Sequence, residues 1–343
     1  MNFDAISDNI LKRFGKTITT IDSHTAGEKT RLIVDGMGDI PGETMMDKCN
    51  FLKEKRDNIR KLMTWPPRGD KSVLAALVTE PVSDGADFGL IYMDAKRYPY
   101  LCGHATIGAV MTLIETGVLE KQGNSPKVLV DTPSGIMETR AHLYNGQVES
   151  VSIKMPPSFV YETGKKLKSS QHGEIHVDLV CVGGFFVMAD VGSTGLAFIT
   201  ENEKSLISLG MELIDLANDA FTVMHPERPE VKTVDVTEFY DGLHTDKGNS
   251  RVIYGEAHMD RSPCGTGTAA KLTLLHHKGL IGVDQIFQNS GPLGTTFSAK
   301  VVKETRIGEL NGVETEITGS ASITGYHEFV LDEKDPFQEG YPP

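Results

Sequence analysis

SPCGTGTAAKLTLLHHKGL, residues 262–280, repeats the pattern of an earlier stretch, YLCGHATIGAVMTLIETGV at residues 100–118. Placing Cys264 over Cys102, 162 positions earlier, makes the two stretches agree at five positions. The agreeing pairs are Cys102/Cys264, Gly103/Gly265, Thr106/Thr268, Leu113/Leu275 and Gly117/Gly279. Agreement that begins at Cys-Gly and ends at a glycine in both copies indicates an internal duplication.

The residues that flank these stretches also correspond. Ile91-Tyr92 and Ile253-Tyr254 stand about ten residues before the two cysteines, and each closes a short apolar run typical of a strand. Apolar residues continue for about four helical turns after each Cys-Gly. Gly117 and Gly279 then suit left-handed helix C-caps. Each half therefore predicts a strand, a turn, a cysteine and a helix.

The sequence downstream of each predicted helix returns to a β pattern, at 127–155 and again at 296–332. This order predicts a duplicated α+β unit and not a doubly wound parallel sheet. We expect an N-terminal half at 1–160 and a C-terminal half at 161–343, with the last strands able to pack back on the first half.

Composition and charge narrow the class of protein. The 343 residues are 39% hydrophobic and 24% charged, which is typical of a globular protein with room for two domains. A net charge of −13 argues against nucleic acid and anionic membranes as partners. No apolar run approaches the roughly 20 residues of a membrane span, and residues 1–24 lack the apolar core of a signal peptide. We expect a cytoplasmic protein.

The four cysteines, at 49, 102, 181 and 264, are too scattered for a disulfide scaffold and lack C-x-x-C spacing. A single buried cysteine is most often a packing residue, which is our interpretation of Cys49 and Cys181. Cys102 and Cys264 differ because each precedes glycine at a predicted helix N-terminus. The helix dipole there favours thiolate, lowers the thiol pKa and can hold a carboxylate.

Three segments carry a specific family resemblance. IDSHTAGEKTR (21–31), CGHATIG (102–108) and DRSPCGTGT (260–268) resemble the signature blocks of the proline racemase family, and the similarity runs from about residue 17 to 340. The resemblance implies a diaminopimelate-epimerase-like fold, in which two pseudo-symmetric domains each wrap a sheet around a central helix and the active site lies in the cleft between them. It also implies a homodimer and chemistry without pyridoxal phosphate, metal or nucleotide.

The resemblance assigns roles to individual residues. Cys102 and Cys264 match the two acid/base thiols of the family. The backbone N–H groups expected to hold the substrate carboxylate belong to Gly103, His104, Gly265 and Thr266. Asp260 and His104 match groups around the ring nitrogen.

The substrate is a cyclic imino acid by the same resemblance. Dehydratase members carry Thr where this chain has Cys264, so we expect racemisation or epimerisation. Leu74, within the altered segment 67–77, replaces a phenylalanine of proline racemases, and Tyr254 replaces another. Gly184, in VGGFF (182–186), stands where the family has a polar side chain. These changes favour 4-hydroxyproline 2-epimerase, with proline racemase as the alternative.

Other classes of function fit less well. GTGTAA (265–270) matches a loose dinucleotide fingerprint with Asp284 downstream, but residues 260–263 separate it from the preceding strand. The histidines share no metal-ligand spacing. A trans-3-hydroxyproline dehydratase and a non-catalytic imino-acid-binding protein remain as more distant alternatives.

Overall fold

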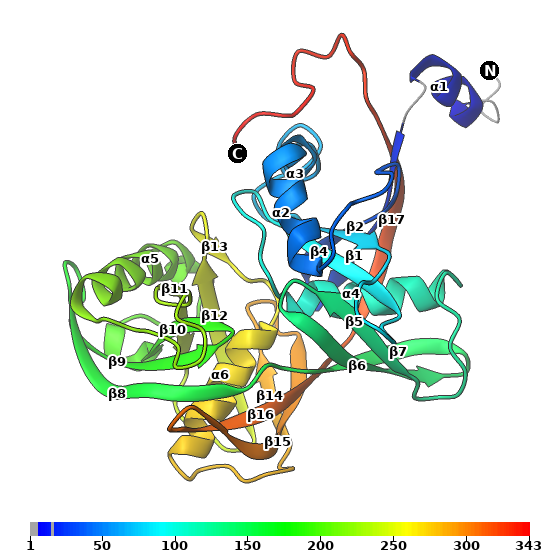
Figure 1. Cartoon of the computed structure of the whole chain (residues 1–343). Coiled ribbons are helices and arrows are strands. Elements are labelled where there is room, and N and C mark those ends of the chain that lie inside the picture. The colour runs from blue at the N-terminus through cyan, green and yellow to red at the C-terminus, as the bar shows by residue number, and fades with distance from the viewer. Residues whose placement is uncertain (1–5, 15–16) are drawn as a thin grey trace. The chain divides into compact units, whose positions relative to one another are not determined.

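The computed structural model describes residues 6–14 and 17–343 and divides the chain into two compact units (Figure 1). Unit 2 contains Ala26–Glu28 and Ser150–Ser320, and unit 1 contains the other described residues. The chain divides at residues 149/150, before the expected 160/161, because residues 151–154 already pair with strand β16 of unit 2. Residues 321–343 return to unit 1.

Unit 1 consists of a mixed sheet and the helices that pack against it. Its strands are β1 (Thr17–Thr25), β2 (Glu28–Asp35), β3 (Leu74–Thr79), β4 (Phe88–Met93), β5 (Lys127–Thr132), β6 (Gly135–Tyr144) and β17 (Ala321–Val330), and β7 (Gln147–Lys154) crosses the unit boundary. Its helices are α1 (Ile6–Phe14), α2 (Met45–Lys55), α3 (Asp57–Thr64) and α4 (Gly103–Glu115). β17 joins unit 1 because it pairs with β1 in antiparallel register along its length.

Helix α4 is the central helix of unit 1. It contacts β1, β3 and β17, and residues 103–113 are all buried. A helix that is apolar on every side must be enclosed to be stable, which explains why strands surround it. Gly117 follows its end with φ +73°, as the predicted C-cap requires.

Unit 2 repeats this design with a closed ring of strands. Its strands are β8 (Ser158–Ser169), β9 (Gly173–Val182), β10 (Gly184–Asp190), β11 (Val234–Tyr240), β12 (Lys247–Tyr254), β13 (His258–Met259), β14 (Phe287–Ser290), β15 (Thr296–Ile307) and β16 (Leu310–Gly319). The pairings run β8–β9–β10–β11–β12–β14–β15–β16 and return to β8. Helix α6 (Gly265–His277) lies inside this ring (Figure 1).

The strand pairings confirm the duplication that the sequence predicts. β2–β3–β4–β5–β6 alternates parallel and antiparallel pairs, and β10–β11–β12–β14–β15 follows the same alternation. α4 and α6 occupy the same place in the two series and are both 13 residues long. The α+β class with a sheet around a central helix is therefore confirmed.

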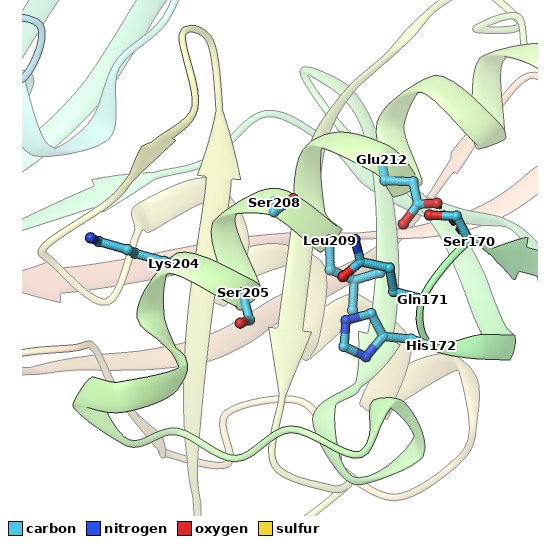
Figure 2. Close-up of a pocket in the computed structure, with 8 residues that line it drawn as sticks. All are labelled: Ser170, Gln171, His172, Lys204, Ser205, Ser208, Leu209 and Glu212. Atoms are coloured by element: carbon cyan, nitrogen blue, oxygen red, sulfur yellow. Dashed lines mark hydrogen bonds between the residues drawn. The ribbon is translucent and has the colours of Figure 1, made fainter.

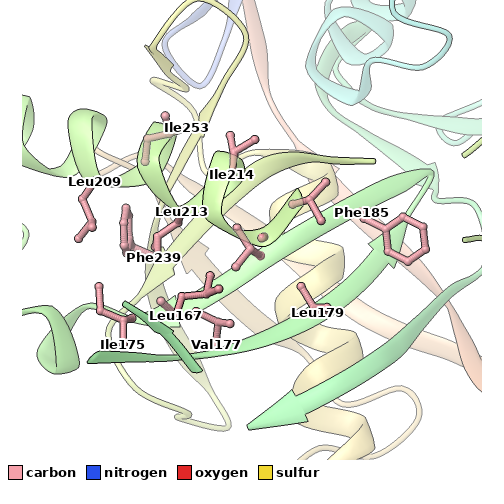
Figure 3. Packing of buried hydrophobic residues seen from close by; sticks show 14 of the residues in the cluster. Leu167, Ile175, Val177, Leu179, Phe185, Leu209, Leu213, Ile214, Phe239 and Ile253 are labelled. Atoms are coloured by element: carbon pink, nitrogen blue, oxygen red, sulfur yellow. The ribbon is translucent and has the colours of Figure 1, made fainter. Parts of the chain in front are cut away.

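Helix α5 (Glu203–Ala220) covers the outside of the unit 2 sheet. Leu209, Leu213 and Ile214 pack with Phe239 and Ile253 in one buried hydrophobic cluster (Figure 3). Two short 3-10 helices, Val191–Thr194 and Thr200–Asn202, precede α5. Across the described part of the chain, no helix combines the length and the apolar character that a membrane crossing requires.

Candidate active site

Cys102 is the N-cap residue of α4 in unit 1. Its backbone is extended, with φ −148° and ψ 109°, and its side chain is half-buried. His104 lies beside it, with Nδ1 at 3.3 Å from Cys102 Sγ. The His104 ring is buried. An imidazole within hydrogen-bonding distance of a thiol can exchange a proton with it, so Cys102 is suited to act as a base.

Thr106, the threonine that the two repeated stretches share, holds the backbone of Cys102 in place. Thr106 donates its backbone N–H (3.1 Å) and its hydroxyl (2.8 Å) to the carbonyl oxygen of Cys102. The Thr106 hydroxyl also lies 2.7 Å from the hydroxyl of the fully buried Tyr92. Thr25 Oγ1 donates to the carbonyl oxygen of His104 at 2.7 Å. These contacts hold the start of α4 to the sheet.

Cys264 is the N-cap residue of α6 in unit 2, and its backbone is unusual. Its φ of +59° lies in the left-handed region that β-carbon-bearing residues rarely adopt. The preceding loop stabilises this conformation: Asp260 Oδ1 accepts from Ser262 N (2.8 Å) and Oγ (2.7 Å), and Ser262 Oγ accepts from Cys264 N (3.0 Å). Asp260 is itself buried. The hydrogen bonds within the DRSPC sequence thus hold the backbone of Cys264 in this conformation.

The environment of Cys264 differs from the expected one. Gly267 N donates to Cys264 Sγ at 3.4 Å, and Thr266 Oγ1 lies at the same distance. These contacts favour thiolate, but burial and the neighbouring charge of Asp260 outweigh them and raise the pKa of Cys264 well above its usual value. The expectation that the helix N-terminus lowers this pKa is therefore wrong for Cys264, because the side chain is enclosed.

Tyr254, at the end of β12, is half-buried and packs edge-on against His258, with ring centroids 5.4 Å apart. His258 Nε2 lies 2.8 Å from Glu28 Oε1, and Glu28 Oε2 accepts from Arg261 N at 2.7 Å. Burial lowers the pKa of His258, but the hydrogen bond and charge of Glu28 raise it above its usual value overall. Sequence analysis did not identify Glu28 or His258, although Glu28 lies within the first signature block.

The remaining expected site residues lie at three places. Gly103 and Gly265 are the first residues of α4 and α6, where helical geometry leaves N–H groups without carbonyl partners inside the helix. Leu74 is the buried first residue of β3 in unit 1. Gly184 begins β10 in unit 2, and a Cβ there would meet no atom within 4 Å. Packing therefore does not force a glycine at 184.

Cys49 and Cys181 have the character of packing residues. Both are buried, and burial raises the pKa of Cys49 to about 11 and that of Cys181 to about 12. Cysteines enclosed in this way are typical packing residues. Among the residues that the structure describes, no group of three or more His, Cys, Asp or Glu side chains could hold a metal ion.

A surface hollow of about 460 Å³ lies on another part of unit 2, between α5 and the turn that joins β8 to β9 (Figure 2). Its lining residues are Ser170, Gln171, His172, Lys204, Ser205, Ser208, Leu209 and Glu212. None of them is an expected site residue. Glu212 is already occupied, since it accepts from Ser169 Oγ and Ser170 N, both at 2.7 Å.

Comparison with known proteins gives a consistent result. The proline racemase family profile matches residues 20–342. The chain is 38% identical to the proline racemase of Clostridioides difficile and 32% identical to the 4-hydroxyproline 2-epimerase of Streptosporangium roseum, in each case over 96% of this chain and 99% of the relative. A crystal structure of a hydroxyproline epimerase from Agrobacterium vitis matches with a TM-score of 0.87 at 27% identity, covering 95% of this chain and 94% of that one.

Proposed function

Because this chain belongs to the proline racemase family of isomerases, we propose that it inverts the configuration at the α-carbon of a cyclic imino acid by a two-thiol mechanism. The observation that carries the proposal is the repeated Cys-Gly at the start of two equivalent helices. Racemisation needs one group to remove a proton and a second to deliver one to the opposite face. A duplicated unit supplies two such groups.

The proposed reaction moves two protons. In one direction the Cys102 thiolate removes the α-proton, the C–H electron pair becomes the carbanion, and Cys264 donates its thiol proton to the other face of the same carbon. Cys102 is then a thiol and Cys264 a thiolate, so the enzyme is ready for the reverse reaction.

The carbanion must be stabilised without an electron-sink cofactor in this proposal. The N–H groups of Gly103 and His104, and those of Gly265 and Thr266, begin two helices whose positive ends favour a carboxylate. Fixed dipoles of this kind stabilise the negative charge that develops as the α-proton leaves. Asp260 and His104 are the groups that we assign to the ring nitrogen.

The two thiols start in different protonation states according to this proposal. Cys102 is half-buried beside the imidazole of His104, whereas Cys264 is enclosed next to Asp260. Cys102 therefore serves as the resting thiolate and Cys264 as the resting thiol. The preferred first substrate is the enantiomer whose α-hydrogen faces Cys102.

We propose 4-hydroxyproline as the preferred substrate, with proline as the alternative. Tyr254 offers a hydroxyl for a ring oxygen, and Leu74 and the open space at Gly184 reduce the bulk around the ring. Two more distant readings, a trans-3-hydroxyproline dehydratase and a non-catalytic binder, are less consistent with the presence of both cysteines. We further propose a cytoplasmic homodimer.

The substrate preference predicts the effect of Tyr254→Phe. A hydrogen bond from Tyr254 contributes about 0.5–1.5 kcal/mol, which corresponds to a preference of about threefold to tenfold for 4-hydroxyproline over proline. Tyr254→Phe should lower kcat/KM for trans-4-hydroxy-L-proline by that factor and leave proline nearly unchanged. Chiral chromatography of both reactions measures the change.

The wild-type enzyme provides the comparison, with trans-3-hydroxy-L-proline as a third substrate. Faster turnover of proline than of 4-hydroxyproline would replace the assignment with proline racemase. Elimination of water from trans-3-hydroxy-L-proline as the main reaction would favour the dehydratase, and no reaction with any of the three would favour the binder.

A further inference from the structure

Glu238 is a buried acid that the proposed reaction leaves unexplained. It lies on β11 inside unit 2, and its side chain is fully buried. Neither carboxyl oxygen has a hydrogen-bond partner among the described residues. The Ser250 hydroxyl near it donates instead to Asn289 Oδ1 at 3.2 Å. A buried carboxyl without such partners is costly to ionise, so its retention needs an explanation.

Glu238 lies beside the first turn of α6 and close to Cys264. Glu238 Oε2 and Cys264 Cβ are each 3.3 Å from the position that a Cβ on Gly267 would occupy. The distance between these two atoms can therefore be no greater than the sum of those two distances. Gly267 also donates its N–H to Cys264 Sγ. The missing side chain of Gly267 thus lets a carboxyl approach the segment that holds the thiol.

The buried ammonium of Lys271 acts on Glu238 through its charge, without a hydrogen bond to it. Lys271 on α6 is fully buried, and its Nζ pairs with Asp241 Oδ1 at 3.4 Å. Its ammonium also faces the rings of Tyr240 and Phe287, at 5.5 and 5.7 Å from the ring centres. Burial lowers the pKa of Lys271, while Glu238, Asp241 and the more remote Asp190 oppose that shift. Lys271 thus pairs directly with Asp241 and also interacts with Glu238 through its charge.

Burial and neighbouring charges act on both Glu238 and Cys264. Burial raises the pKa of Glu238, and the charge of Lys271 only partly opposes that shift. Burial also raises the pKa of Cys264, with added contributions from the charges of Asp260 and Glu238. A carboxylate at Glu238 therefore opposes formation of the thiolate at Cys264.

We propose that Glu238 is a positioning residue that keeps Cys264 as the proton-donating thiol at alkaline pH. This inference rests on the proposed function for its role in catalysis, but its effect on the thiol is independent of substrate. A negative charge about 7 Å from a thiol, at an effective dielectric constant of about 20, shifts the thiol titration upward by about 1 to 2 pH units.

The test is a pH titration of Cys264 followed by thiolate ultraviolet absorbance. In the Cys102→Ser protein, Cys264 is the one remaining thiol of the proposed pair. Subtracting the absorbance of the Cys102→Ser/Cys264→Ser protein isolates the signal of Cys264. Adding Glu238→Gln should lower the midpoint by about 1 to 2 pH units, because the amide keeps the shape but cannot become negative. Glu309→Gln removes a carboxylate from the exposed β15–β16 turn and should leave the midpoint in place.

Glu238→Met provides a second test, since an apolar, unbranched side chain also removes the charge. A folded Glu238→Gln or Glu238→Met protein with an unchanged Cys264 midpoint overturns the proposal. Failure of both variants to fold would also overturn it, because Glu238 would then be a structural residue. With Cys102 intact, Glu238→Gln should move the alkaline limb of kcat/KM to lower pH by the same amount. A shifted midpoint in a protein without racemase activity would refute the proposed function and leave the assignment of Glu238 intact.

Discussion

Cys102→Ser and Cys264→Ser should each lower kcat/KM for racemisation by about 10²- to 10⁴-fold while the protein stays folded. The reason is that the two protons are handled on opposite faces of the α-carbon, so neither thiol can replace the other. A serine hydroxyl is a much weaker acid than a thiol and forms little of its anion near neutral pH. Chiral chromatography of the reaction mixture measures the loss, and circular dichroism checks the fold.

Cys49→Ser is the matched control for this experiment. It makes the same sulfur-to-oxygen change at a buried cysteine of unit 1 that lies outside the proposed site. It should leave kcat/KM close to that of the wild type even if it lowers the melting temperature. A Cys102→Ser or Cys264→Ser protein that retained most of its racemase activity would refute the two-thiol mechanism.

Gly291→Ala should both destabilise the protein and damage its activity, through the loop that carries Cys264. A Cβ at position 291 would lie 2.5 Å from the carbonyl carbon of Ser262 and 2.7 Å from Pro263 N. These are backbone atoms, so relief requires the segment before Cys264 to move. We expect a cost of about 1–3 kcal/mol in unfolding free energy. A displacement near 1 Å at the thiol would reduce kcat/KM by about a hundredfold.

Gly282→Ala is the control for that substitution. A Cβ at position 282 would meet nothing within 4 Å, and its φ lies outside the left-handed region. Urea unfolding and kcat/KM should therefore both remain near wild-type values. If Gly291→Ala and Gly282→Ala had the same unfolding free energy and the same kcat/KM, the loop before Cys264 would tolerate the displacement.

The duplication could be predicted because it depends on local patterns. Three sequence signals predict α4 and α6 almost to the residue: Cys-Gly at the start, apolar residues along the helix and a glycine just after the end. Each signal acts within the helix or at its ends, so it can be recognised without the rest of the fold. The strands that contain Tyr92 and Tyr254 follow for the same reason. The boundary between the units was harder to place, because it depends on the pairing of residues 151–154 with β16, far away in the sequence.

The electrostatics of the site could not be predicted from the same patterns. The sequence predicted Asp260 as a site residue, but its hydrogen bonds to Ser262 depend on the fold of the loop. Glu28 and His258 are 230 positions apart, and only the folded chain shows that they pair. A helix N-terminus favours thiolate at any cysteine, whereas enclosure of Cys264 depends on the whole of unit 2.

The central claim is that two different groups remove and return the α-proton, and the labelling pattern in D2O tests it most directly. Wild-type enzyme should be incubated with trans-4-hydroxy-L-proline, or with L-proline if that is the faster substrate, and both isomers analysed by mass spectrometry during the initial phase of the reaction. The account predicts deuterium at the α-carbon of the inverted product from the first turnovers, while the remaining substrate is still unlabelled. Equal labelling of both isomers from the start, or inversion without deuterium, would contradict it.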